Sequence, residues 1–202
     1  MGKLILQMQI SVDGFVGAAS KIDWLVWNWG GDCTWDDALK ADFNAVFDSV
    51  DCILLSRKMA EGGYLDHWKN AAEQYQQDFY RFARRITDTR KVVVSNRLSR
   101  SIWPRTDVAK GNLSDAVAAL KGQVGGDVIC FGGIGLASSL LASGHVDELQ
   151  LFINPACVGD GSSIFGPSNA GLLKLTSSKP YDCGIVVNCY GFREKGAAVA
   201  AM

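Results

Sequence analysis

The sequence predicts an α/β fold in which helices cover a mixed, mostly parallel central sheet. Apolar runs of strand length alternate with stretches of helical periodicity along most of the 202 residues, which is typical of strands packed against helices. In the last part of the chain, apolar runs at residues 172–176 and 184–192 follow each other closely enough to form an antiparallel hairpin. We therefore expect a sheet that is parallel in its first part and antiparallel at its C-terminal edge.

The elements of the first half follow from these patterns in order. Residues 4–10 form the first expected strand, and a long loop rich in glycine and tryptophan follows it. A helix should begin near Thr34, whose hydroxyl can cap its free amides, and its apolar stripe runs from Trp35 to Val50 at helical spacing. A second strand, a second helix and a third strand are expected at residues 52–55, around 75–86 and at 91–95.

The second half continues the alternation. A short strand near 107–109, a helix at 114–121 capped by Ser114, a strand at 127–131, a helix at 136–142 and a strand at 148–153 are expected in that order. Gly144 stands where a left-handed helix end belongs. We expect one domain over residues 1–193, followed by a frayed, alanine-rich tail over 194–202.

Composition narrows the classes of function. The 20 basic and 21 acidic residues give a formal net charge of −1, without the basic excess of a nucleic-acid-binding protein. No apolar run reaches the length that crosses a membrane, and the first residues do not form a signal peptide. The six cysteines lack the spacing of a zinc site or a redox pair, so we expect no metal and reduced thiols packed as small hydrophobic groups in a cytoplasmic protein.

Four corners of the predicted sheet carry the residues with the most chemical potential. Ligands of open α/β sheets bind beyond the carboxyl ends of the strands. The segments at those positions are 11–14, 56–58, 95–97 and 132–135. Two of them combine hydroxyl groups with cations, and the last is a glycine-rich turn before a helix, so together they predict a surface that reads phosphate groups.

Each of these features also has an ordinary structural explanation. Glycines are common in strand-to-helix turns, and the turn at 132–135 departs from the dinucleotide fingerprint of a Rossmann domain because Ser138 replaces the last glycine. Arg57 and Lys58 can be solvated loop charges, although Arg97 at the next strand end strengthens the functional interpretation. Asp13 precedes a glycine, and Asp-Gly is a frequent turn pair.

Two further candidates lie beyond the strand ends. Asp42 falls near the edge of the apolar stripe of the first helix, where a carboxylate either needs a partner or ligand or simply marks the border of the stripe. Trp24, Trp27, Trp29 and Trp35 can form a stacking wall for a flat heterocycle, or anchor a long loop to the core, which we expect for at least two of them.

Four segments together give the chain a family resemblance. They are residues 11–14, 51–59, 91–98 and 128–165, the last with Phe131-Gly132-Gly133, then residues 146–149, and then Pro155, Gly159, Gly161 and Phe165. In this order they resemble the reductase domain at the C-terminal end of the bifunctional riboflavin-biosynthesis deaminase-reductase. That domain has a dihydrofolate reductase-like fold, with three layers.

The resemblance implies an NADPH-dependent reductase of a small pterin-like or pyrimidine-like heterocycle, often a homodimer. By position it places Asp13 near the nicotinamide and the reaction, and we expect Gly14, Trp24 and Asp42 to contact the substrate. It implies that the cofactor is bound by Arg57, Lys58, Met59, Ser95, Asn96, Arg97, Gly132, Gly133, Gly135 and Leu136. Ser56 replaces the glycine usual before the arginine, and the basic residues expected for a phosphoribosyl substrate are not evident near Asp13.

The sequence leaves three functions open. The first is a stand-alone NADPH-dependent reductase whose physiological substrate is unknown. The second is a riboflavin-pathway reductase or a dihydrofolate reductase proper. The third is an NADPH-binding sensor or scaffold that has lost catalysis. Zinc-dependent deamination is excluded, because the chain has neither the His-x-Glu nor the Pro-Cys-x-x-Cys motif.

Overall fold

A mixed sheet with one antiparallel end organises the molecule. The computed structural model describes residues 2–30, 33–171 and 173–192. Among these, eight strands form one sheet in the order β5-β4-β3-β6-β1-β7-β10-β9. Neighbouring strands pair in parallel along β5, β4, β3, β6, β1 and β7. Strand β10 is antiparallel to both β7 and β9. The strands are β1 (Leu4–Ser11), β3 (Val50–Ser56), β4 (Arg90–Val94), β5 (Thr106–Ala109), β6 (Asp127–Cys130), β7 (Glu148–Asn154), β9 (Leu173–Pro180) and β10 (Val186–Phe192).

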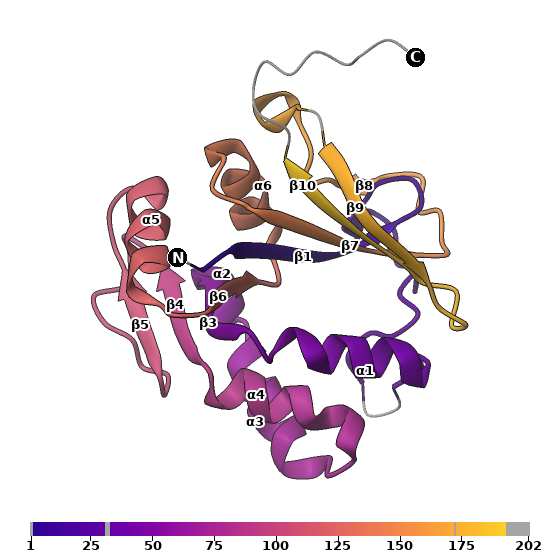
Figure 1. Ribbon diagram of the computed structural model, residues 1–202, viewed down its shortest axis with the longest axis horizontal. Coiled ribbons are helices and arrows are strands. Elements are labelled where there is room, and N and C mark those ends of the chain that lie inside the picture. The colour runs from indigo at the N-terminus through magenta and orange to yellow at the C-terminus, as the bar shows by residue number, and fades with distance from the viewer. Residues whose placement is uncertain (1, 31–32, 172, 193–202) are drawn as a thin grey trace.

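Helices cover both faces of this sheet and make a three-layer fold (Figure 1). On one face lie α1 (Asp37–Val46), α3 (Tyr64–Gln74) and α4 (Arg81–Asp88). On the other face lie α5 (Leu113–Gln123) and α6 (Ile134–Ser143). The smaller elements are α2 (Arg57–Glu61), η1 (Asp78–Tyr80), η2 (Pro167–Asn169) and a two-stranded ribbon of β2 (Gly17–Ala18) and β8 (Gly161–Ser162). The predicted α/β architecture, with its mixed sheet and C-terminal hairpin, is confirmed.

The alternation of side chains along β1 explains why it lies at the centre. Leu4, Leu6, Met8 and Ile10 all enter the core under α5 and α6. The opposite face of the same strand carries Ile5, which belongs to the core on the side of α1, α3 and α4, and then Gln7 and Gln9. The Gln7 Nε2 atom donates to the Gln150 Oε1 atom of β7 at 2.8 Å, which satisfies two buried amides. One face of β1 is therefore hydrophobic, and the other is polar at Gln7 and Gln9.

Two helix caps differ from the sequence expectation. The chain enters α1 through Asp36, which has an extended conformation and accepts a hydrogen bond from the Leu39 amide at 2.8 Å. Thr34 is still in the loop, where its hydroxyl donates to the Val26 carbonyl. Asn112 caps α5 by accepting from the amide of Ser114, so the predicted cap is in fact the second residue of that helix. The predicted left-handed end of α6 at Gly144 is confirmed, with φ of 73°.

The helical region between β3 and β4 is more divided than expected. The single helix predicted around residues 75–86 is wrong, because Tyr75 is extended and ends α3, and a new helix begins at Arg81. The short helix α2 was not expected; Ser56 caps it by accepting from the Met59 amide at 3.2 Å. Val50 begins β3 rather than extending the stripe of α1. Residue 172 and the expected tail at 194–202 lie outside the described residues.

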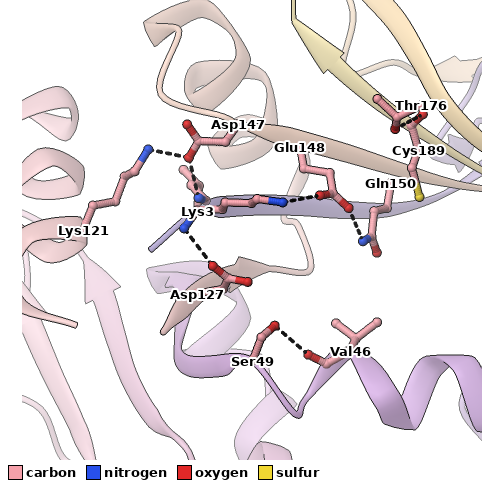
Figure 2. Close-up of polar contacts among 11 residues, drawn as sticks. Lys3, Val46, Ser49, Lys121, Asp127, Asp147, Glu148, Gln150, Thr176 and Cys189 are labelled. Carbon is pink, nitrogen blue, oxygen red and sulfur yellow. Dashed lines mark hydrogen bonds and ion pairs between the residues drawn. The ribbon is translucent and has the colours of Figure 1, made fainter. Parts of the chain in front are cut away.

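The amino-terminal edge of the sheet is closed by polar contacts (Figure 2). The Lys3 amide donates to Asp127 at 2.8 Å, and the Leu4 amide donates to Asp147 at 2.6 Å. Lys121 also binds Asp147, and the Lys3 ammonium lies 3.5 Å from Glu148. These contacts join the beginnings of β1, β6 and β7 to one another and to α5, so the side chains at this edge bind each other.

The cysteines lie among the described residues as free thiols. Cys52 and Cys130 are fully buried, as expected of small hydrophobic groups. Cys157 is exposed, so the expectation that all six pack in the interior is wrong at this position. Its thiol donates instead to the Asp13 carboxylate at 3.1 Å, because the loop after β7 lies over the edge of the sheet. No helix in the described part of the chain is long and apolar enough to cross a membrane.

Replacing Asp36 with alanine tests the cap of α1. The change removes the acceptor for the Leu39 amide and should lower the free energy of unfolding by about 1–2 kcal/mol, as measured by urea denaturation. Asp37→Ala, one residue further on, is the control. Its side chain is fully exposed, and among the described residues its ion pair is with Lys40, so its loss should leave the free energy of unfolding nearly unchanged. Equal losses in the two variants would show that Asp36 is not a cap.

Candidate functional site

Four loops meet at the carboxyl edge of the sheet, where the parallel strands end. The register pairs Ser56 with Val94 and Ser11 with Asn154, while β6 lies between β3 and β1. The predicted corner segments therefore follow one another along this edge in the order 95–97, 56–58, 132–135 and 11–14. The expectation that the strand ends place these segments on one surface agrees with the topology.

Glycines let the start of α6 pack closely against α2. The Gly133 amide lies 2.9 Å from the Met59 Sδ atom, and a Cβ at Gly133 would lie only 3.0 Å from the Ser56 Oγ atom. Gly132 has φ of +113°, a conformation that side-chain-bearing residues rarely adopt. The structure thus brings Met59, Gly132 and Gly133 together, and Ser56 fills the space that a larger residue at 133 would need.

The first turn of α6 is open to a ligand. No side chain caps this ten-residue helix, because its N-cap position is Gly133. A Cβ built on Gly135 would meet nothing within 4 Å, so the surface beside the first turn is free. Free amides and the positive end of a helix dipole favour an anion such as a phosphate group. Leu136, the next residue, is half-buried and packs against the core under α6.

Three cations stand along the same edge. Arg57 begins α2 and pairs with the Glu61 carboxylate one turn further along the helix. Lys58 and Arg97 are exposed, and neither forms an ion pair with any residue that the structure describes. Burying an anion here would therefore not require Lys58 or Arg97 to give up a partner.

Ser95 and Asn96 shape the loop after β4. The buried Ser95 hydroxyl oxygen accepts from the amides of Arg97 and Leu98 at 3.1 and 3.2 Å. Asn96 exchanges two hydrogen bonds with the backbone of Gly111, at 2.7 and 3.2 Å, which ties this loop to the one after β5. Both side chains fix the backbone that carries Arg97.

Asp13 is a clamp between the loops that follow β1 and β7. Its carboxylate accepts from the Ser11 hydroxyl at 2.6 Å, from the amides of Val158 and Gly159 and from the Cys157 thiol. These hydrogen bonds hold the pKa of Asp13 well below the ordinary value of 3.8, and the bond from Ser11 has the largest effect. The Asp13 carboxyl group is therefore ionised at neutral pH and has no proton to donate. Gly14 makes the turn next to it, with φ of +90° and its amide bonded to the Ser11 carbonyl.

A cavity of about 540 Å³ lies between α1, α2, α3 and the end of β6. This volume is in the range of small-molecule sites. We call it the aromatic cavity, and its lining is Asn28, Trp29, Phe43, Lys58, Met59, Gly62, Gly63, Tyr64, His67, Trp68, Ile86 and Phe131. Lys58 and His67 are exposed, whereas Phe43 and Trp68 are buried. The Lys58 and His67 side chains of the lining are therefore more exposed than its aromatic residues Phe43 and Trp68.

A smaller cavity of about 180 Å³ adjoins the floor of the sheet beside β1. Its lining is Gln7, Met8, Gln9, Val16, Trp24, Leu25, Trp29, Trp35, Phe131 and Phe152. Trp29 and Phe131 line both cavities, so they separate the two spaces. Trp29 has φ of 58°, which is a strained backbone for a bulky residue and is common at functional sites.

The tryptophans occupy two kinds of position, in the core and in the lining of the smaller cavity. Trp27 and Trp35 are 2% exposed, and their rings meet edge to face with centroids 4.9 Å apart. Trp27 thus anchors the loop to the core. Trp24 and Trp29 are half-buried and line the smaller cavity, as does the buried Trp35.

Sequence reasoning missed the polar side chains that hold the tryptophan loop. The fully buried Asn154 accepts from the Val26 amide at 2.8 Å and donates to Gln9 at 3.1 Å. Gln9 in turn donates to the Trp27 carbonyl at 3.5 Å. The recurrence of glutamine at alternate positions of a buried strand was the available signal. Sequence reasoning also missed Tyr64, His67 and Trp68, whose spacing places them on one side of α3.

Asp42 does not line either cavity. Its carboxylate binds the Lys179 ammonium and accepts from the Tyr181 hydroxyl at 2.6 Å, so it joins α1 to the hairpin. These two bonds, with that of Lys179 the larger, lower the pKa of Asp42. The structure therefore supplies the partner that a carboxylate at this position needed, and it does not bring Asp42 to the other candidates.

Comparisons with known proteins identify a family and a relative that this chain resembles over most of its length. Residues 2–187 match the family model of the RibD C-terminal domain. The uncharacterized protein YyaP of Bacillus subtilis (strain 168) is 25% identical over 192 residues, covering 93% of this chain and 94% of that protein.

Solved structures show the same fold at low identity. The riboflavin biosynthesis reductase Rib7 of Saccharomyces cerevisiae is 13% identical, with a TM-score of 0.57 over 95% of this chain and 90% of that one. Dihydrofolate reductase of Enterococcus faecalis, complexed with NADP(H), is 12% identical, with a TM-score of 0.59 over 96% of this chain and 98% of that one. The expected dihydrofolate reductase-like fold is confirmed.

Asp13→Asn tests the clamp at the end of β1. The amide keeps the size of the side chain but loses the charge and replaces one acceptor with a donor, so hydrogen exchange at the Val158 and Gly159 amides should accelerate. Asp160→Asn, a substitution in the same loop whose carboxylate makes no described hydrogen bond, is the control. Unchanged exchange at both amides in Asp13→Asn would contradict the clamp.

The same carboxylate gives a pH dependence with a defined sign. Because its pKa is lower in the folded state, the clamp stabilises the fold fully above pH 3.8, and the stabilisation is lost as the pH falls toward the folded-state value. Acid unfolding of the wild type, compared with Asp13→Asn, should therefore show the stabilities of the two proteins converging below this pH.

Proposed function

Because this chain belongs to the RibD C-terminal domain family, we propose that it is an NADPH-dependent reductase of a small planar heterocycle. One observation carries the proposal. The uncapped, glycine-framed start of α6 and three cations lie along the same edge of the sheet as two adjoining aromatic cavities. That arrangement offers a phosphate surface beside a space for flat rings, which a dinucleotide and its substrate both require.

The residues present fit the cofactor. The amides of Gly135 and Leu136 at the first turn of α6 would hold the pyrophosphate, and the Gly133 amide would exchange its contact with the Met59 Sδ atom for a phosphate oxygen. Arg57 and Lys58 would bind the 2'-phosphate of the adenosine ribose, with Arg97 beside them. Arg57 would then exchange the Glu61 carboxylate for the phosphate group. Ser95 and Asn96 would act through the loop that they shape.

The cavities would hold the reacting rings. NADPH supplies the hydride when bound, so the protein's task is to align the two rings and exclude water. Trp29 and Phe131, which line both spaces, would lie between or beside the rings. Trp24 is a further substrate contact through the smaller cavity. We assign Asp13 and Gly14 to shaping the edge, because the Asp13 carboxylate is fully engaged by neighbouring donors.

Two alternative functions are each favoured by a particular observation. A dihydrofolate reductase or riboflavin-pathway reductase proper is favoured by the shared fold. An NADPH-binding sensor or scaffold is favoured by the lack of any described carboxylate in either cavity.

We also propose a cytoplasmic homodimer. The exposed Leu175 and Phe192 on the hairpin, 52% and 41% accessible, support an association through that surface.

Binding and turnover together test the proposal. Titration with NADPH and NADH, followed by tryptophan fluorescence, should show saturable binding that prefers NADPH. NADPH oxidation with panels of folates, pterins and pyrimidines should then identify a turned-over substrate. Tight NADPH binding without turnover on every panel would favour the sensor, and binding of neither nucleotide would contradict the reductase.

Arg57→Ala tests the phosphate assignment. Loss of a charge-assisted hydrogen bond to the 2'-phosphate should weaken NADPH binding about tenfold or more and leave NADH binding nearly unchanged. Arg90→Ala is the matched control, since Arg90 begins β4 at the opposite edge and pairs with Asp107. An unchanged ratio of the two dissociation constants in Arg57→Ala would show that another group reads the phosphate.

Glu61→Gln tests the same site from the other side. The change removes a carboxylate that competes with the phosphate for the Arg57 guanidinium, so NADPH affinity should rise by a fewfold while NADH affinity stays the same. The measurement is the same fluorescence titration. A fall in NADPH affinity would mean that Glu61 supports Arg57 rather than competing with it.

A further inference from the structure

The backbone amide of Gly133 has a hydrogen-bond partner within the chain. Gly133 is the N-cap residue of α6, and its N–H donates to the Met59 Sδ atom of α2 at 2.9 Å. A thioether sulfur is a weak, neutral acceptor, whereas a charged phosphate oxygen is a strong one. One of the amides at the start of α6 is therefore held by an internal acceptor that an anion can displace. We call this interaction the thioether contact.

The backbone on both sides of the thioether contact is fixed. Ser56 caps α2 by accepting from the Met59 amide at 3.2 Å, and the next residue, Ala60, is 2% exposed in the core. On the other side, a Cβ at Gly133 would lie 3.0 Å from the Ser56 Oγ atom, so the absence of a side chain lets α6 approach α2 this closely. Because α2 is anchored, the contact is made or released by the Met59 side chain alone.

The Met59 side chain has space into which it can withdraw. Met59 is half-buried and lines the aromatic cavity of about 540 Å³. Methionine is unbranched and has several rotatable bonds, so it can turn away from Gly133 without a shift of α2. Its withdrawal frees the Gly133 amide beside Gly135, where a built Cβ would meet nothing within 4 Å. The start of α6 then offers an additional free amide to an anion.

A second side chain of α2 occupies another of the proposed phosphate-binding groups. The Glu61 carboxylate pairs with the Arg57 guanidinium within the same short helix. Lys58 and Arg97, in contrast, form no ion pair with any residue that the structure describes. The two contacts made by α2 differ in reach, since Arg57 is assigned to the 2'-phosphate, which NADH lacks, whereas the Gly133 amide is assigned to the pyrophosphate, which both nucleotides carry. Their effects on binding can therefore be separated.

We propose that Met59 regulates access to the pyrophosphate subsite: its thioether occupies the Gly133 amide when no nucleotide is bound, and a phosphate oxygen displaces it. The inference deepens the proposed function, on which it rests, by naming a residue that controls the affinity of that site. It makes Met59 a competitor of the cofactor rather than a contact to it. A neutral ligand has no charged oxygen to offer the amide, so it leaves the subsite closed.

Met59→Leu removes the acceptor and keeps the volume of the side chain. A site that is competent for only part of the time binds every ligand with an affinity reduced by that fraction, so removing the competitor should tighten NADPH and NADH by the same factor, about twofold to fivefold. Fluorescence titration measures both affinities. Glu61→Gln is the comparison, since its effect is confined to NADPH. Unchanged or weaker binding of both nucleotides in Met59→Leu, or a change for NADPH alone, would overturn the inference.

Met59→Gln is the matched variant with the opposite expected sign. Glutamine has a similar length, and its carboxamide oxygen is a better acceptor than a thioether, so it should hold the Gly133 amide more firmly and weaken both nucleotides. A role of Met59 in packing alone predicts no gain of affinity in either variant. Tighter binding in Met59→Gln than in the wild type would contradict the inference. If this variant does not fold, Met59→Leu and the spectroscopic test below decide.

Inorganic pyrophosphate tests the displacement directly, because it has neither rings nor a ribose phosphate. The full chain has four methionines, and labelling their methyl groups with carbon-13 gives a signal for Met59 that is identified by its loss in Met59→Leu. Titration with pyrophosphate should move this signal in a saturable way, and sodium chloride at equal ionic strength should not. Pyrophosphate binding that leaves the Met59 signal in place, or no binding of pyrophosphate, would overturn the inference.

The outcome can be separated from the fate of the reductase. If NADPH binds and the Met59 signal does not move, the inference fails and the proposed function stands. If pyrophosphate moves the Met59 signal and neither nucleotide binds, the reductase fails, and Met59 is shown to control a phosphate site that serves another ligand.

Discussion

The parallel pairing of β1 with β6 on one side and with β7 on the other is the constraint on which the site depends. It aligns the strand ends so that segments far apart in sequence, including residues 11–14 and 157–159, adjoin at one edge. The contacts at the opposite edge, among them Asp127 with Lys3 and Asp147 with Leu4, hold the strand beginnings. With one edge closed by its own side chains, the loops of the other edge are free to form cavities.

The polar face of β1 transmits this order to the tryptophan loop. Gln9 and Asn154 hydrogen-bond to each other and to the backbone of that loop, at Val26 and Trp27. These bonds fix the loop above the sheet, because leaving the buried Asn154 amide unpaired would cost a buried hydrogen bond. Trp29 can thereby be held in a strained conformation between the two cavities, which locates the strain next to the expected chemistry.

The sequence could predict those features that depend on local pattern. The alternation of strands and helices, the C-terminal hairpin and the turn at Gly132 and Gly133 all follow from periodicity and residue type. The cap of α1 could not be assigned with certainty, because Thr34 and Asp36 are both good capping residues and only the path of the chain decides between them. Cys157 likewise follows an apolar strand in sequence, yet the loop carries it to the surface.

The sequence could predict the residues proposed to bind phosphate, but it could not predict the cavities. Arg57, Lys58 and the glycines lie directly after expected strands, where the general rule for α/β sheets points. The walls of the aromatic cavity come from loops and helices that only the tertiary fold brings together, such as Trp29, Tyr64 and Phe131. From the sequence alone, Asp13 and Asp42 were candidates for contact with the ligands. In the structure, their carboxylates are bound by partners far away in the chain, Gly159 for Asp13 and Lys179 for Asp42.

Amide hydrogen exchange of the full chain with and without NADPH tests the central claim most directly, that the cofactor lies along the carboxyl edge of the sheet. The account predicts slower exchange over residues 57–59 and 132–136 when NADPH is present, with no change over residues 147–150 at the opposite edge. Unchanged exchange in the first two segments, or protection confined to another part of the molecule, would contradict it.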